Sequence, residues 1–454
     1  MPGSFGEKPT GTDTQAVFEH PGRFAVEYRP CRAGEGRYEL VMEGIPLRAV
    51  ADVVKTPTYA YALGAVDASI ARMQEALADL DAQICYAVKA NDTHAILARI
   101  AARGVGADIV SGGELARVLR AGVRPKDVVF SGVGKRADEI DAALAAGIAS
   151  INLESAAELD QVTARARATG TTARVSLRVN PRIRADTHPY LATGLAEAKF
   201  GVPLEEAVAL GRRCLADPHL ELVGLACHIG SQIFDAAPFA ESLESLRGAA
   251  RALADAGAKL SRMDVGGGFA IPYTGDEAPM DLAAWARTVG PAARALGLRL
   301  VVEPGRYLLG NAGVLLVRVL ACKTNGARRF VVVDGAMNDL LRPALYDAYH
   351  MIVPVETTKG ALCRPVDVVG PVCETGDFFA LRRPMPEVAA GDLLAVLSAG
   401  AYGATMASTY NTRPLPAEVV LDDGAAAVAR PRQTLSDLLA RDVLEPVFEP
   451  LGGP

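Results

Sequence analysis

Helix-like and strand-like segments alternate without interruption between about residues 65 and 306. The predicted strands are short apolar runs: Ile84–Val88, Ala107–Val110, Val128–Phe130, Ser150–Leu153, Arg174–Val179, Leu222–Cys227, Met263–Val265 and Leu298–Val302. The predicted helices are rich in Ala, Leu, Arg and Glu: Val66–Leu80, His94–Arg103, Gly113–Ala121, Ala137–Ala146, Ala156–Thr169, Glu205–Ala216, Phe239–Ala256 and Leu282–Leu296. Short apolar strands that alternate with helices pack as a parallel sheet. Eight such units predict a closed (β/α)8 barrel, with an open doubly wound sheet as the structural alternative.

After Arg306 the pattern changes to strand-like segments separated by turns rich in Pro and Gly. These segments are Val314–Leu320, Arg329–Val333, Val366–Val369, Leu393–Leu397 and Glu418–Leu421. They predict a mostly antiparallel β domain. Arg23–Tyr28 and Tyr38–Val41 are also strand-like and precede the barrel pattern, so we expect them to join this domain. The predicted boundaries are 1–64 for the N-terminal segment, 65–306 for the barrel and 307–454 for the C-terminal β domain.

Composition excludes several classes of function. The chain has 454 residues, which favours two domains, and a net charge of -6 without a basic block, which argues against a nucleic-acid partner. The longest apolar runs, such as Val223–Cys227, are far too short to span a membrane, and residues 1–22 are polar and contain no secretory signal. Seven cysteines without paired spacing predict a reducing, cytoplasmic compartment, and the six histidines show no zinc-ligand spacing.

Lys89 is the first candidate catalytic residue. It belongs to the segment Tyr86-Ala-Val-Lys-Ala-Asn91, at the end of the first predicted barrel strand. Most lysines are solvated surface charges. Because this one directly follows an apolar run, we expect partial desolvation to lower its pKa and free the amine to attack a carbonyl. This is the chemistry of a Schiff-base lysine.

Further polar residues follow the other predicted strands. An active site in a (β/α)8 barrel lies at the C-terminal ends of its strands, so these residues are expected to meet there. Asp108 lies within the second strand, and the segments that follow the strands include Ser111–Glu114, Arg178–Asn180, His228–Gln232, Gly266–Phe269 and Glu303–Arg306. A barrel with a purely structural role would not need such a cluster.

Each of these features has a simpler interpretation. Gly266–Gly268 could form only a tight turn, although three glycines also let backbone N–H groups approach a phosphate. His228 could be a hydrogen-bonded core residue or a flat ring that stacks on a cofactor. Glu303 could be a salt-bridge partner or could keep a pyridine nitrogen protonated. Together with Lys89, the glycine turn and the carboxylate match the three groups by which pyridoxal phosphate is held.

Motifs that extend from about Thr56 to Asn411 carry a resemblance to a known family. They are Tyr86-Ala-Val-Lys-Ala-Asn91, Arg178-Val-Asn-Pro181, Thr193-Gly194, Lys199-Phe-Gly201, His228-Ile-Gly-Ser-Gln232, Gly266-Gly-Gly-Phe269, Glu303-Pro-Gly-Arg306, Asp334-Gly-Ala-Met-Asn-Asp339, Arg342-Pro-Ala-Leu-Tyr346, Gly370-Pro-Val-Cys-Glu-Thr-Gly-Asp377 and Ala399-Gly-Ala-Tyr-Gly403. The chain resembles the fold-type III pyridoxal-phosphate decarboxylases, the family of alanine racemase and ornithine decarboxylase. The segments Arg342–Tyr346 and Cys373–Asp377 resemble the branch that acts on meso-diaminopimelate.

This resemblance implies roles for individual residues. Lys89 would carry pyridoxal 5'-phosphate as a Schiff base, His228 would stack on its ring and Glu303 would pair with its pyridine nitrogen. The remaining cofactor-binding residues would be Asp108, Arg178, Ser231, Gly266, Gly267, Gly268, Gly305, Arg306 and Tyr402. Cys373 would be the proton donor, and would reach the barrel of the partner subunit in a head-to-tail homodimer. A buried, inert cysteine is the alternative.

The implied reaction converts meso-2,6-diaminopimelate to L-lysine and carbon dioxide, the last step of lysine biosynthesis. The distal carboxylate would be bound by Arg306, Arg342 and Tyr346, because arginine forms bidentate pairs with carboxylates. Tyr402 would be a further substrate-binding residue. Glu374 would bind the distal ammonium. Three alternatives stay open: a related decarboxylase acting on carboxynorspermidine, ornithine or a specialised-metabolism amino acid; a racemase; and a non-catalytic protein that binds pyridoxal phosphate.

Overall fold

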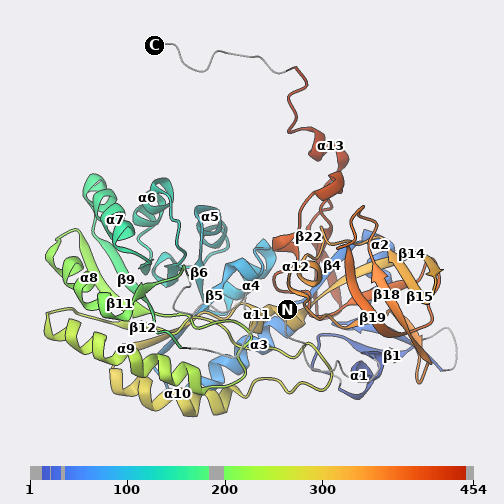
Figure 1. Cartoon of the computed structure of the whole chain (residues 1–454), viewed down its shortest axis with the longest axis horizontal. Coiled ribbons are helices and arrows are strands. Elements are labelled where there is room, and N and C mark those ends of the chain that lie inside the picture. The colour runs from blue at the N-terminus through green and yellow to red at the C-terminus, as the bar shows by residue number, and fades with distance from the viewer. Residues whose placement is uncertain (1–12, 21, 32–35, 184–198, 446–454) are drawn as a thin grey trace.

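The computed structural model describes residues 13–20, 22–31, 36–183 and 199–445 of the chain. Residues 1–12 of the predicted N-terminal segment and the motif Thr193-Gly194 lie outside the described residues. Two structural units lie side by side, a ring of parallel strands surrounded by helices and a second unit built mainly of β-sheet (Figure 1). None of the described helices is both long enough and apolar enough to cross a membrane.

The first unit is a closed barrel of parallel strands. In chain order and in spatial order alike, its strands are β5 (Ala82–Ala87), β6 (Gly106–Ile109), β7 (Val128–Phe130), β8 (Ser150–Leu153), β9 (Ala173–Asn180), β11 (Leu220–Ala226), β12 (Arg262–Asp264) and β13 (Arg299–Val302). The last strand, β13, pairs in parallel with the first, β5, so the ring is closed. The short strand β10 (Val202–Pro203) adds to β9. The predicted (β/α)8 barrel is confirmed, and the open doubly wound sheet is excluded.

Helices cover the outside of the barrel (Figure 1). They are α3 (Leu63–Ala76), α4 (His94–Ala102), α5 (Gly112–Arg120), α6 (Ala137–Ala146), α7 (Ala156–Thr169), α8 (Leu204–Ala216), α9 (Ala237–Asp255) and α10 (Leu282–Leu296). Local chemistry explains the bounds of α7: the Ser155 hydroxyl accepts the Glu158 N–H at 3.1 Å, and Gly170 ends the helix with φ 65°. The bounds of α6, α7 and α10 are those predicted from the sequence.

The second unit contains a mixed sheet in the order β19-β18-β15-β14-β4-β21-β22, and β20 and β16 pair on its flank. Its strands are β4 (Thr58–Ala62), β14 (Gly313–Asn325), β15 (Arg328–Val333), β16 (Ile352–Pro354), β18 (Cys363–Val369), β19 (Phe378–Pro386), β20 (Leu393–Val396), β21 (Ala417–Asp422) and β22 (Ala425–Arg430). Most pairs are antiparallel, as expected. Two pairs, β15 with β18 and β4 with β21, are parallel.

The N-terminal segment joins this second unit, as the sequence predicted. Strand β2 (Arg37–Met42) pairs with β1 (Glu27–Pro30), β3 (Ile45–Pro46) and, far along the chain, β17 (Glu356–Thr358). Strand β4 lies between β14 and β21 in the large sheet, although the sequence pattern did not predict it. The short helices of this unit are α1 (Asp13–Glu19), α2 (Leu47–Val54), α12 (Arg342–Tyr346) and α13 (Leu435–Leu439).

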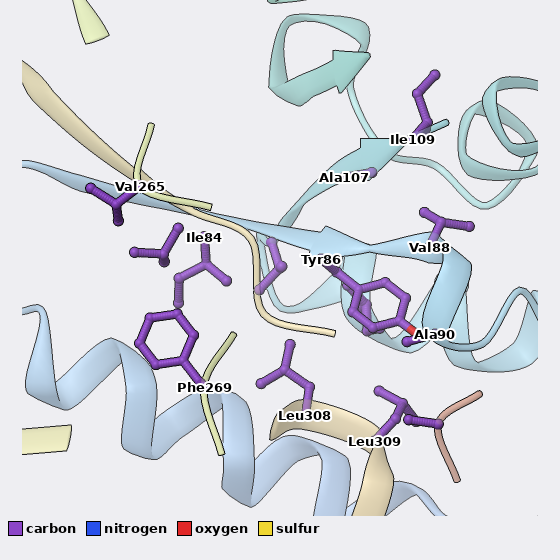
Figure 2. Close-up of a cluster of buried hydrophobic side chains, with 14 of the residues drawn as sticks. Ile84, Tyr86, Val88, Ala90, Ala107, Ile109, Val265, Phe269, Leu308 and Leu309 are labelled. Atoms are coloured by element: carbon purple, nitrogen blue, oxygen red, sulfur yellow. The ribbon is translucent and has the colours of Figure 1, made fainter. Parts of the chain in front are cut away.

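The hydrophobic core continues from the barrel to the turn that follows β5. Figure 2 shows the Tyr86 side chain, which leaves β5 and lies beside the apolar side chains of α11 (Arg306–Leu309). Tyr86 is fully buried, and its hydroxyl donates a hydrogen bond to the Asn91 carbonyl at 2.9 Å. This bond spans the 3-10 turn Val88–Ala90. The core therefore fixes the backbone that carries Lys89.

Candidate active site

A cavity of about 240 Å³ lies at the C-terminal ends of the barrel strands. The predicted site residues that line it are Lys89, His228, Ser231, Gly267, Gly268, Glu303, Gly305, Arg306, Arg342, Tyr346 and Tyr402. The barrel and the second unit both contribute to the lining of this cavity, because Arg342 and Tyr346 belong to helix α12 of the second unit. Three larger hollows, of about 570, 650 and 490 Å³, contain neither Lys89 nor the glycine turn. Lys89 and the other predicted site residues named above therefore lie around the smaller cavity.

Lys89 is the middle residue of the 3-10 turn, and its amine lies 2.7 Å from a carboxylate oxygen of Asp108. Asp108 is on the neighbouring strand β6 and is fully buried. Burial lowers the pKa of Lys89, but the negative charge of Asp108, with contributions from Tyr402 and Glu303, raises it above the ordinary lysine value. The expected lowering of this pKa is therefore wrong, because the apolar run around Lys89 does not reveal the carboxylate on the next strand.

Glu303 follows β13 and is buried at the cavity with a second carboxyl group close by. Burial raises the pKa of Glu303 well above its ordinary value, and the neighbouring Asp108 and Asp264 carboxylates raise it further. Burial also raises the pKa of Asp264 to about 6. Glu303 is consequently a carboxyl group that holds a proton readily, as a partner for a basic ring nitrogen must.

His228 follows β11 and presents a neutral ring to the cavity. Burial lowers the pKa of this histidine well below its ordinary range, and the positive charges of Arg178 and Lys89 act in the same direction. The backbone N–H of Gly230 donates to Nδ1 at 3.3 Å, which places the ring proton on Nε2. A neutral, flat imidazole at this position can stack on an aromatic ring.

The turn Gly266–Gly268 has no room for side chains. Gly266 and Gly268 have φ angles of 72° and 99°. A Cβ atom on Gly266 would lie 2.8 Å from the Cys227 carbonyl, and one on Gly267 would collide with the Glu303 carbonyl. The backbone of Gly267 and Gly268 therefore forms the cavity wall directly. Such a turn can bind an anion through its N–H groups.

Two buried arginines, Arg306 from α11 and Arg342 from α12, line the same cavity. Arg306 donates to the Ser231 hydroxyl at 3.2 Å, and its guanidinium lies 4.9 Å from the centre of the Tyr402 ring. Tyr402 is held against the first barrel strand's turn, because its N–H donates to the Ala90 carbonyl at 2.7 Å. The arrangement gives a strongly positive wall to the cavity that Lys89 also lines.

Some predicted residues lie outside this lining. Asp108 contacts the Lys89 amine, Gly266 is the first residue of the glycine turn, and Arg178 on β9 pairs with Glu154 at 2.7 Å. Their predicted roles in cofactor binding stay predictions.

Cys373 and Glu374 are exposed on the loop between β18 and β19. The Cys373 N–H donates to Asn411 at 3.3 Å, and Glu374 accepts a hydrogen bond from Tyr410 at 3.0 Å. The alternative of a buried, inert Cys373 is wrong. Neither residue lines the cavity of its own chain.

The sequence analysis assigned no role to several residues of the site, although Phe200 belongs to the motif Lys199-Phe-Gly201. Phe200 and Met406 line the cavity. Tyr273 lies directly behind it, where its hydroxyl oxygen accepts hydrogen bonds from Arg306 at 2.5 Å and Arg342 at 2.8 Å. Tyr273 belongs to the loop after β12, so it is at the C-terminal end of a barrel strand, which was the available signal.

Comparison with known proteins places this geometry in context. Residues 63–310 match the family described as pyridoxal-dependent decarboxylase, pyridoxal binding domain. The chain is 45% identical over 404 residues to a diaminopimelate decarboxylase of Neisseria meningitidis, covering 89% of this chain and 99% of the relative. It is also 45% identical over 408 residues to a diaminopimelate decarboxylase of Pseudomonas aeruginosa, covering 90% and 98%.

Solved structures of diaminopimelate decarboxylases are also similar to this chain. The diaminopimelate decarboxylase of Helicobacter pylori, complexed with L-lysine, aligns with a TM-score of 0.83 and 41% identity, over 87% of this chain and 98% of that one. The corresponding enzyme of M. jannaschii, also complexed with L-lysine, aligns with a TM-score of 0.86 and 32% identity, over 93% and 98%. The likeness therefore covers both structural units.

Proposed function

Since the chain belongs to the pyridoxal-dependent decarboxylases and, among them, to the diaminopimelate decarboxylase family, we propose that it converts meso-2,6-diaminopimelate to L-lysine and carbon dioxide. This carboxy-lyase reaction is the last step of lysine biosynthesis. The observation that carries the proposal is the pair of buried arginines, Arg306 and Arg342, in the same cavity as Lys89. A substrate with a carboxylate at each end matches this arrangement.

The cavity fits pyridoxal phosphate. Lys89 offers the amine, the Gly266–Gly268 turn and Ser231 offer donors for a phosphate, and Glu303 offers a carboxyl group for the pyridine nitrogen. His228 supplies a neutral ring for stacking. When bound, the cofactor supplies a ring that accepts the electrons left behind by a departing carboxylate.

The residues around the cofactor control charge during the reaction. The raised pKa of Glu303 favours a proton shared with the pyridine nitrogen, which keeps the ring electron-poor. Asp108 orients the Lys89 amine through the 2.7 Å contact. We assign Arg178 a supporting role in keeping His228 neutral, because its positive charge lowers the pKa of that ring.

Substrate orientation follows from the charges on the cavity wall. One amino-acid end of diaminopimelate reacts beside Lys89, and the other carries a carboxylate that must be held. We assign Arg306, Arg342, Tyr346 and Tyr402 to this distal carboxylate and Glu374 to the distal ammonium. Ornithine has no distal carboxylate, so its binding would leave both buried guanidinium charges without a partner.

We also propose a head-to-tail homodimer in which each chain completes the site of its partner. Cys373 and Glu374 are exposed and lie outside their own chain's cavity, so they are free to extend into a neighbouring one. Helix α13 projects from the second unit (Figure 1) and exposes Leu435 and Leu439, apolar side chains that a second copy would cover. Cys373 would then return a proton to the carbon that loses carbon dioxide. No disulfide bond joins any of the described cysteines, which supports a cytoplasmic location.

The test is carbon dioxide release by the purified holoenzyme on meso-diaminopimelate, ornithine, arginine and carboxynorspermidine in parallel. We expect strong release from diaminopimelate alone. Release from another of these substrates would retain the decarboxylase chemistry of Lys89 and overturn the roles of Arg342, Tyr346 and Glu374. No release from any of them would overturn the proposed reaction and favour a racemase or a binding protein.

A further inference from the structure

Within the part of the chain that the structure describes, Arg306 and Arg342 are buried cations without an acidic partner. They are 6% and 5% exposed, and among the described residues no Asp or Glu oxygen lies within 4.0 Å of either guanidinium. A buried charge without a counter-charge is costly, and proteins normally pair it. An arrangement that keeps two such charges side by side at a cavity is therefore directed at an anion that enters it.

Two neutral acceptors hold the arginines instead. The Tyr273 hydroxyl oxygen accepts from Arg306 Nη1 at 2.5 Å and from Arg342 Nη1 at 2.8 Å, and so bridges them. Both guanidinium groups also lie near the Tyr273 ring, at 5.9 and 5.1 Å from its centre. Burial raises the pKa of Tyr273, yet the two adjacent cations lower it overall, a direct sign of the positive potential at this point.

His350 is the second acceptor, and its partners fix its tautomer. It lies between α12 and β16 and is fully buried. Nδ1 is 2.8 Å from the Leu397 carbonyl, which only accepts hydrogen bonds, so Nδ1 carries the proton. Nε2 is 3.0 Å from Arg342 Nη1, which only donates, so Nε2 offers its lone pair. His350 therefore has to be neutral to make both contacts.

Neutral acceptors hold the guanidinium groups in position without neutralising them. An aspartate or glutamate at either position would form an internal ion pair and remove the attraction for an incoming carboxylate. We propose that Tyr273 and His350 are positioning residues, which hold the guanidinium groups of Arg306 and Arg342 so that their positive charges bind the distal carboxylate of the substrate. We call Arg306 and Arg342 the arginine clamp. This inference rests on the proposed function, since it concerns the same site.

The test compares ligands that differ only in the distal carboxylate. L-Lysine keeps that carboxylate, whereas cadaverine has the same chain without it. The affinity of each for the holoenzyme is measured by calorimetry, and KM and kcat for diaminopimelate are measured in parallel. We expect Tyr273→Phe to weaken L-lysine about tenfold, equivalent to about 1.4 kcal/mol, and to raise KM for diaminopimelate by a similar factor. Cadaverine affinity and kcat should change less than about twofold.

Two further variants separate positioning from folding. His350→Phe should reproduce the selective loss of L-lysine affinity, and His350→Gln should recover part of it, because the glutamine amide oxygen can accept from Arg342. Tyr61→Phe is the matched control: Tyr61 is a fully buried tyrosine whose hydroxyl donates to Glu418 at 2.8 Å, outside the cavity. It should leave both affinities unchanged.

Two results would overturn the inference: equal losses for L-lysine and cadaverine, which indicate a merely structural role, or an unchanged L-lysine affinity. Because these are binding measurements, they report on the clamp even if the wild-type holoenzyme releases no carbon dioxide from diaminopimelate. An absence of carbon dioxide release would contradict the proposed reaction, but not the proposed roles of Tyr273 and His350.

Discussion

Asp108 controls the charge of Lys89, and replacing it should change how the apoenzyme reacts with its cofactor. Only a neutral amine attacks the aldehyde of pyridoxal phosphate. Because Asp108 raises the pKa of Lys89, Asp108→Asn should lower it and shift the pH profile of reconstitution toward lower pH. The rate of reconstitution of the apoenzyme, followed by absorbance across pH, measures this. A profile with an unchanged midpoint would show that another group sets the charge of Lys89.

His350 should make the folded state less stable in acid. Burial lowers its pKa well below the ordinary value, and Arg342, Arg306 and Arg383 act in the same direction. Below about pH 6.5 the unfolded chain binds a proton at this histidine that the folded chain does not, so the free energy of unfolding falls as pH falls. The slope reaches about 1.4 kcal/mol per pH unit for one such group.

Urea denaturation at a series of pH values tests this dependence. Wild type and His350→Gln should diverge below about pH 6.5, with the shallower slope in the variant, because glutamine does not titrate. His228 also has a strongly lowered pKa and is present in both proteins, so part of the slope should remain. Parallel curves for the two proteins would contradict the assignment of the lost stability to His350.

At the scale of elements, helix α1 ties the N-terminal segment to the part of the chain that carries His350. Asp13 at its first position is buried and accepts hydrogen bonds from Tyr349 at 2.5 Å and Arg383 at 2.8 Å. Arg383 also donates to the His350 carbonyl at 2.8 Å. The N-terminal segment thus contributes an ion pair to the second unit, and the arginine of that pair contacts His350.

Removing the Asp13 carboxylate should therefore be costly. Asp13→Ala leaves the buried Arg383 without its counter-charge, and we expect the free energy of unfolding to fall by about 3 kcal/mol. Glu19→Ala, at the exposed end of the same helix, is the control and should change it by less than about 0.5 kcal/mol. Equal effects of the two substitutions in urea denaturation would indicate that α1 acts through its helix rather than through this ion pair.

The elements that sequence predicted well are those with a local signal. Each βα unit of the barrel shows its own apolar run and its own helical pattern, as in α7, so the barrel could be predicted unit by unit. The place of strand β4 in the sheet has no such signal, because its partners are far along the chain: Thr58 pairs with Leu316 and with Ala417. The parallel pairing of β15 with β18 is equally invisible to a local pattern.

The same distinction applies to the candidate site. The rule that active sites follow barrel strands located Lys89, His228 and Glu303, because each follows a recognisable apolar run. The pKa of Lys89 and the bridging role of Tyr273 depend on contacts between separate strands and loops. Those contacts exist only in the folded chain, so the sequence placed the reactive groups but not their electrostatic control.

At the scale of the whole molecule, the two units divide the chemistry between them. The barrel carries Lys89 and the glycine turn, and the second unit contributes Arg342 to the same cavity, whereas the exposed Cys373 of the second unit does not line that cavity. The proposed head-to-tail dimer resolves this separation, because the exposed loop of one chain would enter the cavity of the other. Complementation between two inactive variants distinguishes this arrangement from a site completed within one chain.

Lys89→Ala and Cys373→Ala chains, carrying different affinity tags, are co-expressed and the mixed species is purified through both tags. In a shared site, a mixed dimer pairs the intact barrel of the Cys373→Ala chain with the intact loop of the Lys89→Ala chain. One of its two sites is then complete, and about half of the wild-type activity per dimer should return. If each site used its own chain's cysteine, neither site would be complete and no activity would return. Failure to recover any species carrying both tags would instead contradict the dimer itself.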